Sequence, residues 1–211
     1  MILVIDYGMG NLRSAQKGLE KSGHEAVVSS NPDDIGQADG ILLPGVGAFK
    51  DCYDGLTSGG FVEPILQAIE ADIPLLGICV GMQMLFEHSE EGEGSPGLGI
   101  LKGNVTRFPH ATDTGLKVPH MGWNRLQLVQ ERPCPILQNL SDDPYVYFVH
   151  SYHPVLDDDL TTYATATYGY TFPAVVGRDK IFGTQFHPEK SQLEGIGILK
   201  AFGDFVEKNV N

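Results

Sequence analysis

The sequence predicts a single α/β domain built on a central mixed, largely parallel sheet flanked by helices, with antiparallel β additions in its second half. Over roughly the first ninety residues, short apolar runs alternate with helical stretches, a pattern typical of parallel strands covered by helices. From about residue 99, β-rich runs follow one another with turns between them and little helix. The 211 residues suit one substantial domain, and no repeat or linker divides them, so we expect the domain to span residues 1–211.

The first half supplies the expected parallel strands and their helices. Helical patterning is found over residues 11–22 and 61–71, and between these stretches lie short apolar runs bounded by turn residues. The strands are expected at ILVIDY (2–7), EAVVSS (25–30), GILLPG (40–45) and PLLGIC (74–79).

We expect the β-rich runs of the second half to add antiparallel strands to the same sheet or to form a small subsidiary one. A final helix is predicted after Ser191, which would form a capping box with Glu194, and Leu199, Phe202 and Val206 share one apolar stripe of that helix. The β-rich runs are GILKGNVTRF (99–108), GWNRLQLV (122–129), YVYFVHSY (145–152), YATATYGY (163–170), AVVGRD (174–179) and KIFGTQF (180–186).

Composition narrows the classes of function. A net charge of −13 disfavours nucleic acids and anionic membranes as partners. No run approaches the roughly eighteen apolar residues that a membrane span needs, and the opening MILVIDYG is expected to be a strand and not a signal peptide. The three cysteines, Cys52, Cys79 and Cys134, are odd in number and lack metal-ligand spacing. We therefore expect no disulfide framework, no metal site and a cytoplasmic location.

Cys79 lies in the pattern G-x-C-x-G, between Gly77 and Gly81, where an apolar strand precedes it and a helix is expected over residues 81–88. This is the cysteine counterpart of a nucleophile elbow, in which the nucleophile occupies a strained turn and small neighbours let the backbone pass. The backbone N–H of Val80 could then hold a developing oxyanion. The alternative is an inert core thiol, which is what most free cysteines are.

A base for this thiol is expected at His187, at the end of the run 180–186. A residue before proline favours extended geometry, and residues i and i+2 of an extended segment share a face, so Glu189 should lie beside the His187 imidazole. A carboxylate on one ring nitrogen would leave the other free to take a thiol proton. The alternative is a surface turn in which Glu189 pairs with Lys190. The other histidines lack such a carboxylate on a strand; they are His24, His88, His110, His120, His150 and His153.

With residues 77–81 and 187–189 in place, the chain resembles the class I (triad) glutamine amidotransferases from its start to near its end. More narrowly, it is similar to the glutaminase subunits of imidazole glycerol phosphate synthases of histidine biosynthesis. Val80 stands where the class usually has leucine, which matters little because the role there belongs to a backbone N–H. The narrower likeness is carried by DYGMGNL (6–12), LPGVGAF (43–49), PHMGWN (119–124) and FVHSY (148–152).

This resemblance implies a triad of Cys79 as nucleophile, His187 as base and then acid, and Glu189 as orienter, hydrolysing glutamine through a glutamyl thioester. The oxyanion hole would combine the Val80 N–H with an N–H from the 44–47 loop, either that of Val46 or that of Gly47. Two glycines in that loop let a peptide plane reorient cheaply. A tight strand-to-helix turn is the plainer interpretation of the loop.

Substrate contacts are expected around the same turn. Gln83 lies one helical turn after Cys79, so its carboxamide could hold glutamine, although a solvent-facing helix residue is the alternative. The resemblance adds Glu91, which would pair with the substrate ammonium. The remaining substrate-binding candidates are Gly45, His150, Ser151 and Tyr152.

Three residues, Asn11, Met121 and Trp123, have no place in the hydrolysis. By resemblance they would face a (β/α)8 barrel cyclase subunit, which would form a heterodimer with this chain and receive ammonia through an internal passage. A lone tryptophan such as Trp123 is most often a core residue. The glycines after the first strand do not form a dinucleotide fingerprint, since the third glycine would fall at Arg13, and we expect no cofactor.

Three rival functions remain at this point. A glutaminase of another amidotransferase would have the same triad and a different acceptor, and a cysteine peptidase on a related scaffold would cleave peptides instead of glutamine. A flavodoxin-like binding or regulatory module would keep Cys79 as a core residue, so a glutamine-mimicking electrophile would leave its thiol unmodified.

Overall fold

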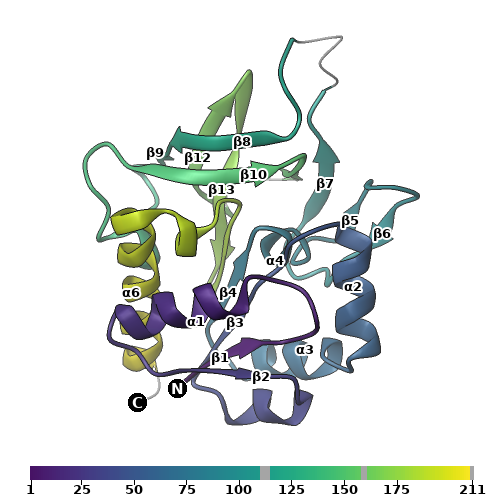
Figure 1. The fold of residues 1–211 in the computed structure, drawn as a ribbon, viewed down its shortest axis with the longest axis vertical. Coiled ribbons are helices and arrows are strands. Elements are labelled where there is room, and N and C mark those ends of the chain that lie inside the picture. The colour runs from purple at the N-terminus through teal and green to yellow at the C-terminus, as the bar shows by residue number, and fades with distance from the viewer. Residues whose placement is uncertain (110–114, 158–160, 210–211) are drawn as a thin grey trace.

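The computed structural model describes residues 1–109, 115–157 and 161–209. Its largest sheet orders eight strands of the described residues as β2-β1-β3-β4-β14-β13-β12-β9 (Figure 1). The first five strands run parallel, and the last three join antiparallel, which confirms the mixed, largely parallel sheet. The strands are β1 (Ile2–Ile5), β2 (Ala26–Ser29), β3 (Gly40–Leu43), β4 (Leu75–Ile78), β9 (Gln127–Leu128), β12 (Thr162–Tyr168), β13 (Tyr170–Arg178) and β14 (Ile181–Thr184).

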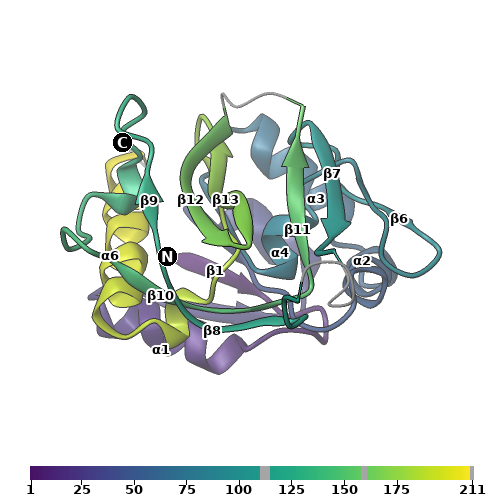
Figure 2. The ribbon, with the colours of Figure 1, turned by 90° about the horizontal axis from the view of Figure 1, so that it is seen from above.

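Helices cover both faces of this sheet (Figure 2). Helix α1 (Leu12–Lys21) packs against α6 (Gln192–Asn209) on one face, and α2 (Phe49–Ser58) and α3 (Val62–Glu70) lie on the other. Strands β1, β3, β4 and β14 are buried along their whole length, as expected for parallel strands covered on two sides. Helix α2 was not among the helices expected from sequence. No helix of the described ranges is long and apolar enough to cross a membrane.

The second half forms both kinds of addition that the sequence left open. Strands β12, β13 and β9 extend the main sheet, and two smaller sheets form beside it. One pairs β8 (His120–Arg125) with β10 (Tyr145–His150). The other has the order β11-β7-β5-β6 and contains β5 (His88–Ser89), β6 (Ser95–Pro96), β7 (Gly103–Arg107) and β11 (Tyr152–Leu156).

One strand of the second half was assigned the wrong pairing. Strand β14, the KIFGTQF run, pairs parallel with β4 on one side and antiparallel with β13 on the other, so it completes the parallel block. Ile78 and Thr184 are register partners at the carboxyl ends of β4 and β14. Because those ends meet at one edge of the sheet, the residues that follow each strand are brought together.

Two expectations about helices were also wrong. The helix after Cys79 is the single turn α4 (Val80–Gln83) and does not reach residue 88. The capping box does not form, because the Ser191 hydroxyl donates to the His187 carbonyl and the Glu194 carboxylate binds Ser141. The apolar stripe of α6 is confirmed, since Leu199, Phe202 and Val206 are all buried.

Candidate active site

Cys79 occupies a strained turn between β4 and α4. Its φ of 55° and ψ of −112° lie in a backbone region that residues other than glycine rarely adopt, at a cost of about 1–3 kcal/mol. The Cys79 N–H donates to the Thr184 carbonyl over 2.7 Å, which ties the turn to β14. A Cβ at Gly81 would lie 2.0 Å from the Leu43 carbonyl oxygen, and one at Gly77 would lie 2.8 Å from that of Gly81. Both flanking glycines are therefore required, as the elbow pattern predicts.

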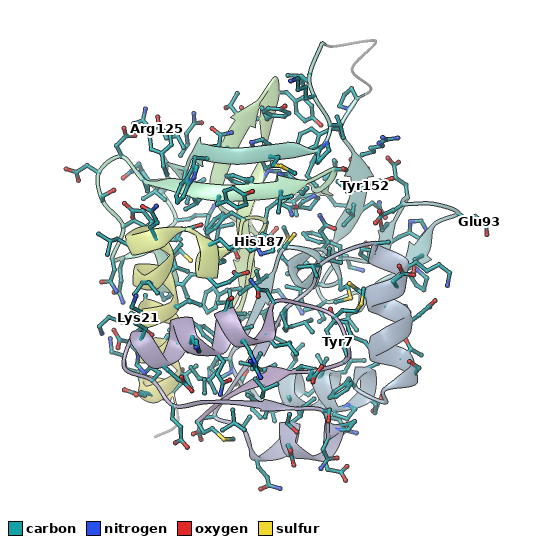
Figure 3. The ribbon with its side chains drawn as sticks, viewed as in Figure 1. Tyr7, Lys21, Glu93, Arg125, Tyr152 and His187 are labelled. Carbon is teal, nitrogen blue, oxygen red and sulfur yellow. The ribbon has the colours of Figure 1, made fainter. Side chains whose placement is uncertain are left out.

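His187 follows β14 and faces the same turn. Its Nδ1 and the Glu189 Oε1 are 2.8 Å apart, and both side chains are almost completely buried. The contact was expected, but its route was not, since Pro188 begins the short 3-10 helix η4 (Pro188–Lys190) and brings Glu189 back under the ring. His187 itself is extended, as a residue before proline should be. Figure 3 shows His187 near the centre of the molecule, between Tyr152 above it and Tyr7 below.

The charge state of His187 reflects these neighbours. Burial lowers its pKa, but interactions with the Cys79 sulfur and the Glu189 carboxylate outweigh burial and raise the pKa to about 9. Its Nε2 makes no hydrogen bond of ordinary geometry within the described residues. Since Nδ1 is held by a carboxylate, Nε2 is the nitrogen left to exchange a proton with the sulfur. A ring with a raised pKa retains such a proton readily.

A cavity of about 580 Å³ opens over Cys79. It brings together most residues that the sequence proposed for the site, although Gly45 does not line it and Glu189 lies behind the His187 ring. Cys79 is only 4% exposed, and this cavity gives substrate a route to it. The lining residues expected from the sequence are Asn11, Val46, Gly47, Cys79, Val80, Gln83, Glu91, His150, Ser151, Tyr152 and His187.

The expected oxyanion donor is already engaged. The Val80 N–H donates to the Gly45 carbonyl oxygen over 3.3 Å, so that oxygen occupies the place where an oxyanion would be held. Gly45 fits there only because it lacks a side chain, since a Cβ would lie 2.4 Å from the Gly81 nitrogen. Gly47 has a φ of +94°, which glycine adopts readily and other residues do not.

Gln83 is not a solvent-facing residue. It is 3% exposed, and its Nε2 donates to the Tyr152 carbonyl over 2.9 Å and to Gln185 Oε1 over 3.1 Å. Gln185, whose own Nε2 lies 3.9 Å from the Cys79 sulfur, was missed by sequence reasoning, because nothing in a short β-rich run marks a side chain that will face a distant turn. Glu91 accepts a hydrogen bond from the Phe49 N–H over 2.7 Å, at the start of α2.

Two histidines form a buried polar chain behind the cavity. His150 Nδ1 lies 2.8 Å from the Tyr152 carbonyl, and His150 Nε2 lies 2.9 Å from His120 Nδ1. Burial lowers the pKa of His150 to about 3 and that of His120 to about 4, so both rings are neutral at pH 7. Since a carbonyl only accepts, Nδ1 of His150 must be protonated, and its Nε2 then accepts from His120. Asn124 Nδ2 can donate to the remaining nitrogen of His120, 3.2 Å away, which completes the chain.

The residues proposed for a partner surface are on β8 or at the cavity rim. Met121 is 62% exposed and Trp123 is 47% exposed, so Trp123 is not a core residue. Its ring packs edge-on against Tyr147 of β10, with centroids 6.1 Å apart. Asn11 lines the cavity.

Of the described histidines that competed with His187, none combines a carboxylate partner with a place on the wall of the Cys79 cavity, and His110 lies outside the described residues. His24 lies with Asp204 and Glu207 in the one grouping of possible metal ligands among the described residues. The two carboxylates contact opposite nitrogens of the ring, at 3.3 Å and 2.9 Å, and Lys200 bonds both oxygens of Asp204. These contacts, with the Lys200–Asp204 ion pair, account for both ring nitrogens of His24 and for both carboxylates as one hydrogen-bonded cluster.

The family profile described as Glutamine amidotransferase class-I matches residues 3–203. The chain is 56% identical over 207 residues to the imidazole glycerol phosphate synthase subunit HisH of Syntrophotalea carbinolica, covering 97% of this chain and all of the relative. It is 53% identical to the HisH subunit of Geobacter sulfurreducens, over 96% of this chain and 98% of the relative.

Solved structures share the fold at lower identity. A crystal structure of a glutamine amidotransferase matches with a TM-score of 0.75 at 17% identity, covering 98% of this chain and 100% of the other. PurLQS from Thermotoga maritima matches with a TM-score of 0.74 at 20% identity, covering 97% of each chain. With a matching profile over nearly the whole length and relatives above 50% identity, the chain belongs to the class I glutamine amidotransferase family.

Proposed function

We propose that this chain is the glutaminase subunit of an imidazole glycerol phosphate synthase, hydrolysing L-glutamine to glutamate and ammonia in histidine biosynthesis. One observation carries the proposal: a cysteine on a strained turn faces a histidine that a buried carboxylate holds from behind, inside a cavity large enough for glutamine. Two relatives more than 50% identical to this chain are named imidazole glycerol phosphate synthase subunit HisH, and this supports the choice of that synthase. Residues 1–211 form one glutamine amidotransferase type 1 domain in this proposal.

The reaction runs in two halves. The Cys79 sulfur bonds to the amide carbon of glutamine with its proton held on His187 Nε2, as the raised pKa of the ring favours. The tetrahedral intermediate collapses when the C–N bond breaks and His187 returns the proton to the departing nitrogen, which leaves as ammonia. A water then gives a proton to His187 and attacks the thioester, the C–S bond breaks, and the sulfur regains its proton as glutamate leaves. Glu189 fixes the His187 tautomer and stabilises the imidazolium in both halves.

Both tetrahedral intermediates need donors for a negative oxygen, and the resting loop opposes this. The Gly45 carbonyl holds the Val80 N–H, and its own oxygen would repel an oxyanion. Turning over the peptide between Gly45 and Val46 would remove that carbonyl and present the Val46 N–H instead. We therefore assign the second donor to Val46 in preference to Gly47. Loss of one such donor typically costs about 3 kcal/mol of barrier.

The proposed substrate contacts follow from the lining of the cavity. One oxygen of Glu91 is bound to the Phe49 N–H, and the other would pair with the substrate ammonium. Gln83 holds the Tyr152 carbonyl and so acts by shaping the wall along His150, Ser151 and Tyr152. Gly45 would contact substrate only through its backbone.

We further propose that a (β/α)8 barrel cyclase subunit forms a heterodimer with this chain in the cytoplasm. It would cover Asn11, Met121 and Trp123 and receive ammonia through an internal passage. The exposed apolar side chains of β8 and the position of Asn11 on the cavity wall support this orientation.

The test is Cys79→Ala in the assembled complex. We expect glutamine hydrolysis to be abolished and synthesis from added ammonia to continue, because only the first of these needs the thiolate. Equal loss of both activities would contradict the division of labour. Cleavage of peptides at a rate above that of glutamine would favour the peptidase alternative, and synthesis of another product would identify another synthase.

A further inference from the structure

Two buried side chains that the proposed reaction does not use bind the loop between β3 and α2. The Tyr7 hydroxyl donates to the Pro44 carbonyl over 2.6 Å. The Cys52 thiol donates to the Val46 carbonyl, with its sulfur 3.4 Å away. Tyr7 is 8% exposed and Cys52 is fully buried, so both contacts are screened from water.

These contacts fall on either side of one peptide unit. The Pro44 carbonyl belongs to the peptide before Gly45, and the Val46 carbonyl belongs to the peptide after Val46. The peptide between them carries the Gly45 carbonyl, for which the described residues supply one hydrogen bond, the longer one from the Val80 N–H. The loop is thus fixed at both ends by side chains and held weakly in its middle.

Such an arrangement limits which part of the loop can move. With the flanking carbonyls held, a turnover of the middle peptide is confined to the ψ of Gly45 and the φ of Val46, and glycine tolerates such a change. The Val46 N–H would then arrive at one repeatable position. Burial raises the pKa of Cys52 to about 11 and also raises that of Tyr7, so both groups remain protonated donors at neutral pH.

We propose that Tyr7 and Cys52 are positioning residues that hold the Pro44 and Val46 carbonyls, so that the Gly45–Val46 peptide alone turns over and its N–H meets the oxyanion. The inference rests on the glutaminase activity proposed above. It concerns the placement of a donor that is needed only when charge develops on oxygen. Its signature is therefore a change in kcat with little change in substrate binding.

The experiment compares Tyr7→Phe, Cys52→Ala and Cys52→Ser with the wild type in the assembled complex. We expect kcat for glutamine hydrolysis to fall roughly tenfold in Tyr7→Phe and several-fold in Cys52→Ala, with KM within twofold, since one neutral hydrogen bond is lost in each. Cys52→Ser keeps a donor and should recover most of the loss. Cys134→Ala, which removes another buried thiol that does not line the cavity, is the matched control and should leave kcat unchanged.

A second readout separates donor placement from general disturbance. Alkylation of Cys79 by iodoacetamide forms no oxyanion, so its rate, followed by mass spectrometry, should equal that of the wild type in every variant. The proposal is overturned if Tyr7→Phe and Cys52→Ala both keep kcat within twofold, or if alkylation falls in parallel with kcat. If Tyr7→Phe fails to fold, the comparison of Cys52→Ala with Cys52→Ser tests the proposal. Failure of the proposed glutaminase function would give a different result, because the wild-type complex itself would then not hydrolyse glutamine.

Discussion

Replacing Glu189 by glutamine tests how the carboxylate behind His187 contributes to the reaction. Glutamine keeps the size of the side chain and an oxygen that can accept from Nδ1, so the variant removes charge and little else. Burial lowers the pKa of His187, and Cys79 and Glu189 together more than reverse this, giving about 9 against an ordinary value of 6.5. That difference corresponds to about 3 kcal/mol of preference for the imidazolium.

Because Glu189 supplies this preference together with Cys79, Glu189→Gln should lower kcat by more than tenfold and leave KM nearly unchanged. The pKa of His187, followed by the NMR shift of its ring proton, should fall, because one of the two groups that raise it is lost while burial still lowers it. The raised pKa stabilises the folded state fully below pH 6.5, and this contribution is lost as pH rises through 9. The variant should show less of this dependence.

Glutamate release in the presence of the partner measures kcat, and Glu207→Gln is the matched control. Glu207 also bonds a histidine nitrogen, that of His24, but it is 70% exposed and does not line the cavity, so its loss should not change kcat. The reasoning is refuted if Glu189→Gln retains kcat within tenfold of the wild type, or if the His187 pKa does not move.

Two further predictions concern the buried histidine pair and the exposed face of β8. His150 and His120 have lowered folded pKa values, so the unfolded chain binds more protons below about pH 6.5 and stability should fall with pH; from pH 7 to pH 5 His150 alone accounts for about 2 kcal/mol. Urea unfolding at the two pH values measures this, and a decrease no smaller in His150→Gln would contradict the assignment. Trp123→Ala should weaken partner binding at least tenfold with little change in the unfolding free energy, whereas Val27→Ala, a similarly exposed residue of β2, should leave the Kd unchanged. Isothermal titration with the purified partner distinguishes the two, and equal Kd values would remove Trp123 from the interface.

Patterns local in sequence predicted most of the fold. The spacing of apolar residues predicts which positions are buried, and this was enough to predict β1, β3, β4 and the apolar stripe of α6. The pairing of β14 could not be deduced in that way, because a short apolar run does not specify the direction of its neighbour. The same limit applies to α4, where a glycine-flanked turn was followed by an apolar stretch that fits a helix and a buried loop equally well.

The candidate site divides along similar lines. The G-x-C-x-G and His-Pro-Glu patterns predicted Cys79, His187 and Glu189 as site residues, and the structure brings all three together. The engagement of the Val80 N–H by Gly45 was not predictable, because the orientation of one peptide depends on contacts made across the fold. The neutral state of the His120–His150 pair likewise depends on burial that no local pattern reports.

The insertion of β14 between β4 and β13 has a consequence for biogenesis. During synthesis the thiol emerges more than a hundred residues before its proton acceptor, and long-range strand pairing of this kind is among the slower steps of folding. Until the late strand docks, the nascent chain has an unpaired sheet edge, and Cys79 lacks the histidine that we propose as its general base. Glutamine hydrolysis therefore depends on completion of the sheet, and a chain that has not yet docked β14 would not hydrolyse glutamine.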